Sequence, residues 1–123
     1  MATNRVFELG GGHKTITMPV ISGTVSGDAV ATVGISGVAL TDRDADGNAT
    51  VCVGNAAFDL PVAAGTDDTS PLANGSAVAV GDLIYVNATT GVVSKDAGGV
   101  LLGYALETVT SGETATIRVM LRN

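Results

Sequence analysis

Short runs of β-branched and other apolar residues recur along the whole chain, and each run is closed by Gly, Asn or Asp. Apolar residues at i, i+3, i+4 and i+7, the signature of an amphipathic helix, nowhere continue for more than about ten residues. Short runs bounded by turn residues are typical of strands. The pattern therefore predicts an all-β fold with little helix.

The runs predict ten strands, over residues 5–9, 14–20, 29–33, 37–41, 49–53, 56–62, 82–86, 91–94, 100–106 and 115–121. In the last run Ile117, Val119 and Leu121 alternate with polar residues, which places one face of that strand against a core. About ten short strands in one chain imply a small β-barrel or a β-sandwich. The stretch from 63 to 80 has no clear period, and Ser70 before Pro71 suits a helical turn over residues 70–73.

The size and composition fit one compact domain. The chain has 123 residues, of which 66 are Gly, Ala, Val or Thr, so small and β-branched side chains dominate the expected core. A hydrophobic content of 46% with only 15% charged residues excludes a disordered chain. We expect a single β domain over residues 12–123.

Three consecutive glycines, Gly10, Gly11 and Gly12, separate the first run from this domain. Because glycine bends the chain at low steric cost, residues 1–11 are predicted to form an extended N-terminal arm and its hinge. The triplet fits neither phosphate-loop pattern and no helix follows it. No apolar run of signal-peptide length precedes it, which predicts synthesis in the cytoplasm.

The charge pattern excludes two classes of partner. Twelve acidic against six basic residues give a net charge of −6, and the basic residues are scattered singly, so no basic stripe exists for nucleic acid. The longest windows without a charged residue have 13 residues, which is too short for a membrane helix. We expect neither a nucleic-acid partner nor a membrane partner.

One acidic turn has the first half of a calcium-loop pattern. Asp42, Asp44 and Asp46 alternate before Gly47, but Val53 stands where the pattern needs a bidentate Glu, and the flanks are typical of strands. A solvated hairpin tip with no metal is the simpler interpretation. A weak calcium site formed by these three carboxylates is the alternative.

The remaining candidates for chemistry favour no catalytic site. His13 and Cys52 are the only residues of their types, too few for a structural zinc site, and Cys52 lies between two valines in an expected buried strand position. Asp67 and Asp68 lie in a polar loop, where nothing apolar would raise a carboxyl pKa. We expect no cofactor and no enzymatic activity.

Three stretches carry a resemblance when they are taken in order. They are residues 37–42 (GVALTD) with 50–53 (TVCV) and 57–61 (AFDLP); residues 80–86 (VGDLIYV) with 91–93 (GVV); and residues 102–107 (LGYALE) with 111–121 (SGETATIRVML). Together they cover most of the chain, which resembles the small capsid decoration (cement) proteins of tailed bacteriophages. The Gly10–Gly12 triplet and the acidic loop at Asp67 and Asp68 depart from that pattern.

The resemblance implies a virion protein that binds the outer surface of the phage head. It implies contact with adjacent major capsid protein subunits, stabilisation of the mature capsid, and a homo-oligomer, with a trimer favoured and a dimer possible. It carries over no catalytic residue. We expect the arm to add as a strand to the capsid or to a neighbouring subunit. The expected capsid-binding residues are Ala2, Thr3, Asn4, Arg5, Val6 and Phe7.

Two other functions remain open from the sequence. The acidic turn is compatible with a calcium- or carbohydrate-binding β module on the virion surface. That module needs aromatic platforms, and the candidates Tyr85 and Tyr104 lie in apolar runs that we expect to be core. The third possibility is a structural subunit of the phage tail or baseplate.

Overall fold

The computed structural model describes residues 5–8 (backbone), 14–32, 34–54, 56–64, 77–95 and 98–122, and these contain strands and turns but no helix. The strands are β1 (Arg5–Glu8), β2 (Lys14–Pro19), β3 (Ala29–Ala31), β4 (Ser36–Ala39), β5 (Asn48–Gly54), β6 (Ala56–Ala63), β7 (Leu83–Val86), β8 (Val93–Ser94), β9 (Val100–Ala105) and β10 (Thr114–Leu121).

All ten predicted strands are confirmed, as is the all-β class. The Gly hinge, His13, the Asp67–Asp68 pair and the predicted helical turn at 70–73 lie outside the described residues.

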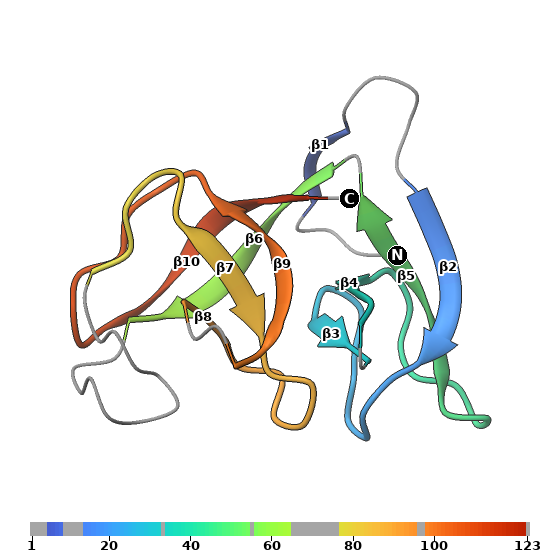
Figure 1. Cartoon of the computed structure of the whole chain (residues 1–123). Helices are drawn as coiled ribbons and strands as arrows, with labels where there is room; N and C mark the ends of the chain where they lie inside the picture. The colour runs from blue at the N-terminus through green and yellow to red at the C-terminus, as the bar shows by residue number, and fades with distance from the viewer. Residues whose placement is uncertain are drawn as a thin grey trace.

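The larger sheet closes into a five-stranded barrel (Figure 1). Its strand order is β1-β6-β10-β9-β7-β8, and β8 returns to pair in parallel with β6 at Ala63 and Ser94. The longest ladder joins β6 and β10, from Thr114 opposite Ala63 to Met120 opposite Ala57. Because side chains alternate along a strand, Phe58 and Leu60 of β6 and Val119 of β10 point into the barrel, where they are fully buried.

The smaller sheet has the order β2-β5-β4-β3 and is antiparallel throughout. One of its faces, with Val38 and Cys52, shares a continuous core with the barrel. The other face, with Ala39 and Val51, builds a second buried cluster. The Ser36 hydroxyl donates a hydrogen bond of 2.6 Å to the Leu101 carbonyl, which joins β4 directly to β9. Strands β3 and β4 are buried along their whole length, whereas β2 at the edge of the sheet is exposed at every residue except Met18.

Two glycines allow strands to approach more closely than any side chain permits. A Cβ on Gly37 would overlap the Cys52 carbonyl oxygen in β5, and a Cβ on Gly103 would overlap the Met120 carbonyl oxygen in β10. Both obstacles are backbone atoms, which cannot rotate away. These glycines therefore set the spacing of β4 against β5 and of β9 against β10.

Candidate functional site

The connection between β2 and β3 is a loop fixed by its own polar side chains. The Thr24 hydroxyl donates to the Ile21 carbonyl at 2.7 Å, and the Asp28 carboxylate accepts the Val25 N–H at 3.0 Å. Ser26 is tied to the rest of the sheet, because its N–H donates to the Asp42 carboxylate at 2.9 Å and its hydroxyl to the Leu40 carbonyl at 3.1 Å. The loop therefore has one defined shape.

The β7–β8 hairpin turn faces this loop and is equally constrained. The Asn87 side-chain oxygen accepts the N–H groups of Thr89 and Thr90 at 2.8 and 3.0 Å, and the Asn87 carbonyl accepts the Gly91 N–H at 2.7 Å. Gly91 has a φ of +77°, which glycine adopts without strain. A Cβ there would lie 3.6 Å from Ile21 Cδ1, so the two loops meet at this point.

A groove opens where the two loops meet strand β6. It consists of two adjoining cavities of about 330 and 370 Å³, and Pro61, Gly91 and Val93 line both. The first also contacts Ile21 and Asp28, and the second contacts Val92. Sequence reasoning missed this groove, because its walls come from three segments that are far apart in the chain. The only signals in the sequence were the turn residues and a proline inside a strand.

Pro61 is tolerated in β6 because of its place on the sheet edge. On the edge away from β10, β6 pairs with β1 at residues 56–58 and with β8 at Ala63, and no described strand pairs with it between these points. Proline is accepted in strands where no ladder hydrogen bond is required of its nitrogen. Pro61 therefore contributes an exposed ring to the groove instead of a ladder bond.

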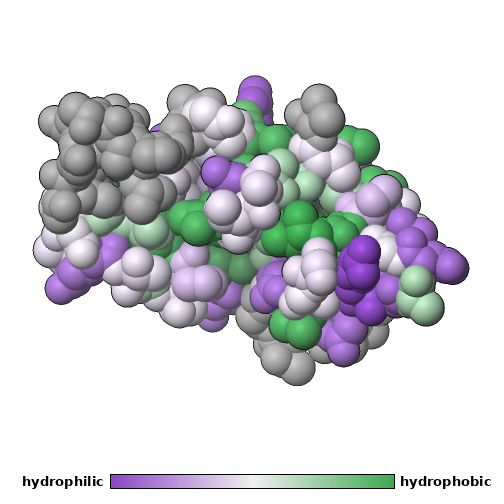
Figure 2. All heavy atoms as spheres, turned by 90° about the horizontal axis from the view of Figure 1, so that it is seen from below, coloured by the Kyte–Doolittle hydropathy of each residue, from purple (hydrophilic) through white to green (hydrophobic). Residues whose placement is uncertain are grey.

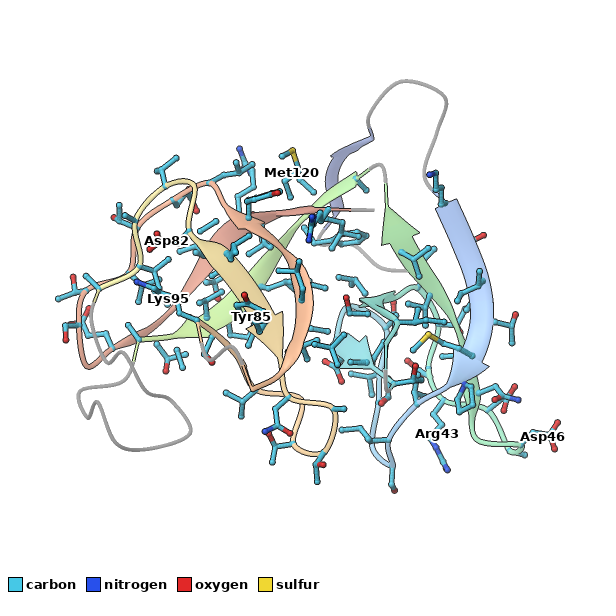
Figure 3. All side chains as sticks on the ribbon, viewed as in Figure 1. Arg43, Asp46, Asp82, Tyr85, Lys95 and Met120 are labelled. Carbon is cyan, nitrogen blue, oxygen red and sulfur yellow. The ribbon has the colours of Figure 1, made fainter. Side chains whose placement is uncertain are left out.

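The acidic turn of residues 42–47 is organised by its own backbone. Asp44 Oδ1 accepts the N–H groups of Asp46 and Asn48, both at 2.9 Å, and Asp42 Oδ1 accepts the Ser26 N–H. Among the residues that the structure describes, no three His, Cys, Asp or Glu side chains lie close enough together to hold a metal ion. The structure thus does not bring Asp42, Asp44 and Asp46 together as ligands. Asp46 lies at the tip of the turn (Figure 3).

Asp82 organises the turn before β7. Its carboxylate accepts the Ala79 N–H at 2.8 Å and forms an ion pair with Lys95 Nζ at 3.2 Å (Figure 3). The hydrogen bond from Ala79 lowers the pKa of Asp82 below its ordinary value; partial burial opposes the shift, and Lys95 reinforces it. Gly81, with a φ of +94°, completes the turn. This interaction explains the Gly81-Asp82 pair in the sequence.

Glu107 and Cys52, which also lie in the stretches that carry the resemblance, have structural roles as well. The Leu106 N–H donates to the Arg118 carbonyl at 2.8 Å, and Glu107 Oε2 accepts the Arg118 N–H at 2.8 Å, so Glu107 extends the β9–β10 ladder beyond the end of β9. Cys52 is fully buried, as predicted, and its thiol donates to the Gly54 carbonyl at 3.4 Å. Glu107 and Cys52 therefore hold the scaffold in shape.

The prediction that Tyr85 and Tyr104 are core residues is wrong. Both are half-buried, because alternation turns the neighbouring Ile84, Val86 and Ala105 into the barrel and the tyrosines outward. Tyr104 lies directly opposite Leu83 on one side and Met120 on the other. Leu83 is 41% exposed. The barrel thus has an outward apolar row of Leu83, Tyr104 and Met120.

The predicted N-terminal arm is described only in part. Arg5, Val6 and Phe7 lie in β1, which pairs antiparallel with β6 and is the terminal strand of its sheet. Ala2, Thr3 and Asn4 lie outside the described residues. In this single chain, β1 therefore continues the protein's own sheet. In the described part of the chain, no helix has the length and apolar character needed to cross a membrane.

The fold and its surface define a β scaffold in which polar side chains fix the turns and a groove is open to solvent. A family model described as phage cement protein matches residues 10–121, nearly the whole chain, and the protein belongs to that family. Comparisons with curated proteins and with solved structures give no match. Family membership makes this a structural, non-enzymatic component of the virion capsid that decorates and stabilises it.

Proposed function

We propose that the protein binds the outer surface of the phage head and cements adjacent major capsid protein subunits. The observation that carries this proposal is the match of the cement-protein family to residues 10–121. The scaffold is compatible with that role, because its loops are fixed by internal hydrogen bonds and need little ordering on binding.

The protein acts as a homo-oligomer in this proposal, a trimer in preference to a dimer. A single contact of roughly 800 Å² per partner supports only modest affinity, whereas an oligomer that engages several capsid subunits raises the apparent affinity by about 10²- to 10⁴-fold. Because it binds the assembled lattice and not free subunits, it stabilises the lattice by mass action.

We also propose that residues 1–11 act as an arm on the β domain of residues 12–123. Ala2, Thr3, Asn4, Arg5, Val6 and Phe7 are its capsid-binding residues. Two observations support the arm. Strand β1 ends its sheet, so its outer edge can take a further strand by main-chain hydrogen bonds. The family match begins at residue 10, in the Gly hinge, so residues 1–9 lie outside it.

The test is sedimentation of the purified protein with emptied heads and, separately, with unassembled capsid protein. We expect co-sedimentation with the heads at saturable stoichiometry and none with the unassembled protein. Equal binding to both, or binding to neither, would contradict the cement function.

Deletion of residues 1–11 tests the arm separately. The loss of several main-chain hydrogen bonds, each worth about 1 kcal/mol, is expected to weaken head binding at least about tenfold. Circular dichroism and thermal unfolding of the deletion variant serve as the control for its fold. If the folded deletion variant binds heads with unchanged affinity, the capsid-binding role of the arm is refuted, but the cement function is not.

A further inference from the structure

The groove beside Pro61 is a concave surface whose first cavity has a mixed polar and apolar lining and whose second cavity is mostly apolar. Pro61 and Val93 line both of its cavities, and Ile21 and Val92 extend it to either side. Val92 is 40% exposed, and Val25, next to the lining residue Thr24, is 51% exposed. Figure 2 shows hydrophobic residues across the middle of this side of the molecule, with strongly hydrophilic residues directly beside them. Exposed apolar patches of this kind mark interaction surfaces.

The walls of the groove are fixed before any partner arrives. Asn87 holds the hairpin turn through four hydrogen bonds, and Thr24 and Asp28 hold the opposite loop. A partner therefore meets a surface of defined shape, and the entropic cost of ordering the protein on binding is small.

The groove has one sign of charge. Of the described residues that line the two cavities, Asp28 is the only ionisable one, and neither cavity is lined by Lys or Arg. The Asp28 side chain is held in place because its Oδ2 accepts the Val25 N–H. The whole chain also carries a net charge of −6. A partner that presents a basic side chain here is favoured, and an acidic one is repelled.

We propose that this groove is the surface that docks on the capsid, and that it receives a short apolar segment of the capsid protein whose Lys or Arg side chain pairs with Asp28. The proposal rests on the proposed cement function and names the contact that performs it. The lining includes no aromatic side chain, which disfavours a flat ring or sugar as the occupant. Small side chains such as Pro61, Ala63 and Val93 instead suit a closely packed peptide segment.

The test uses the full chain and two pairs of matched variants. Val92→Arg places a charge in the groove, and Leu83→Arg places the same charge on the outward barrel row, at a site of nearly equal exposure, 41% against 40%. Asp28→Asn removes the groove carboxylate but keeps an oxygen for the Val25 N–H. Asp46→Asn makes the same change in net charge at the tip of the acidic turn. Head affinity is measured by sedimentation at two salt concentrations, and oligomer mass by light scattering.

We expect Val92→Arg to weaken head binding by about 10- to 100-fold, because a charged side chain replaces an apolar one that the interface would bury. Asp28→Asn should weaken it about 3- to 10-fold and reduce its salt dependence, because one charge pair is lost. Leu83→Arg and Asp46→Asn should bind like the wild-type protein. Asp28→Asn preserves the loop hydrogen bond and keeps the test decisive if Val92→Arg does not fold.

Three outcomes would contradict the docking role of the groove but leave the cement function intact. They are wild-type affinity in both groove variants, an equal loss of affinity in the Leu83→Arg control, and a change of oligomer mass in Val92→Arg. The last outcome would make the groove a contact between copies of this chain. If the wild-type protein itself does not bind heads, the cement function fails, and the groove proposal fails with it.

Discussion

Gly103 lies in β9 opposite Leu121 of β10, at a point where the barrel leaves no room for a side chain. In Gly103→Ala the added Cβ would overlap the Met120 carbonyl oxygen and lie 2.8 Å from the Met120 carbonyl carbon and 3.0 Å from Leu121 Cα. All three are backbone atoms of β10, so the only relief is to move β9 away from β10. That movement stretches ladder hydrogen bonds and opens the packing around Val119.

The expected cost is at the upper end of overpacking effects, about 3 kcal/mol. A domain has only about 5–15 kcal/mol of stability, so the loss is large. It should lower the melting temperature by roughly 10 °C, given a shift of about 4 °C per kcal/mol for a chain of this size.

The assay is urea unfolding followed by far-UV circular dichroism, with tyrosine fluorescence as a second probe because the chain has no tryptophan. Gly34→Ala is the matched control, since a Cβ on Gly34 meets no atom within 4 Å and its φ is not positive. It should be neutral or slightly stabilising, by up to about 1 kcal/mol. A Gly103→Ala variant within about 0.5 kcal/mol of the wild-type protein, which is the usual range for an unconstrained surface site, would refute the close approach of β9 and β10.

The other two predictions concern Asp82 and Cys52. Because the pKa of Asp82 is lowered in the folded protein, its contribution to stability is present above its unfolded value of 3.8 and disappears as the pH falls through the folded pKa. Asp82→Asn should cost up to about 1 kcal/mol at pH 7, and this difference should vanish in acid denaturation curves at low pH; a difference that stays constant with pH would contradict the lowered pKa of Asp82. The buried Cys52 thiol should react with a thiol reagent only after denaturation, and rapid labelling of the native protein would contradict its burial.

Much of the fold could be predicted because it depends on local patterns. The ten runs of apolar residues became ten strands, with ends that differ by one or two residues. Alternation in β10 predicted that Ile117, Val119 and Leu121 face the core, and all three are buried. Cys52 was also placed correctly, because its valine neighbours made its strand one of the most apolar in the chain.

The sequence is misleading about which side chains of β7 face the core. In a strand whose residues are all apolar, no polar residue marks the outward face. The run from Leu83 to Val86 is entirely apolar, so composition alone put Tyr85 in the core. Only one face of β7 points into the barrel, and Ile84 and Val86 lie on that face. The apolar sequence of β7 therefore reflects two different environments: the barrel core, and the outward row that Leu83 shares with Tyr104.

By itself, the order of short apolar runs and turn residues determined that the chain is a β protein, because each strand and each turn depends on neighbours a few residues away. The three motif stretches also carried the family resemblance. Only the tertiary structure decided where a partner could dock. The groove is made by Ile21 and Asp28 in one loop, Pro61 in β6 and Val92 in a hairpin. Closure of the barrel brings Pro61 close to Val92, and packing of the smaller sheet against the barrel adds the loop. No local pattern marks such a surface, because it depends on distances between strands that are remote in the sequence.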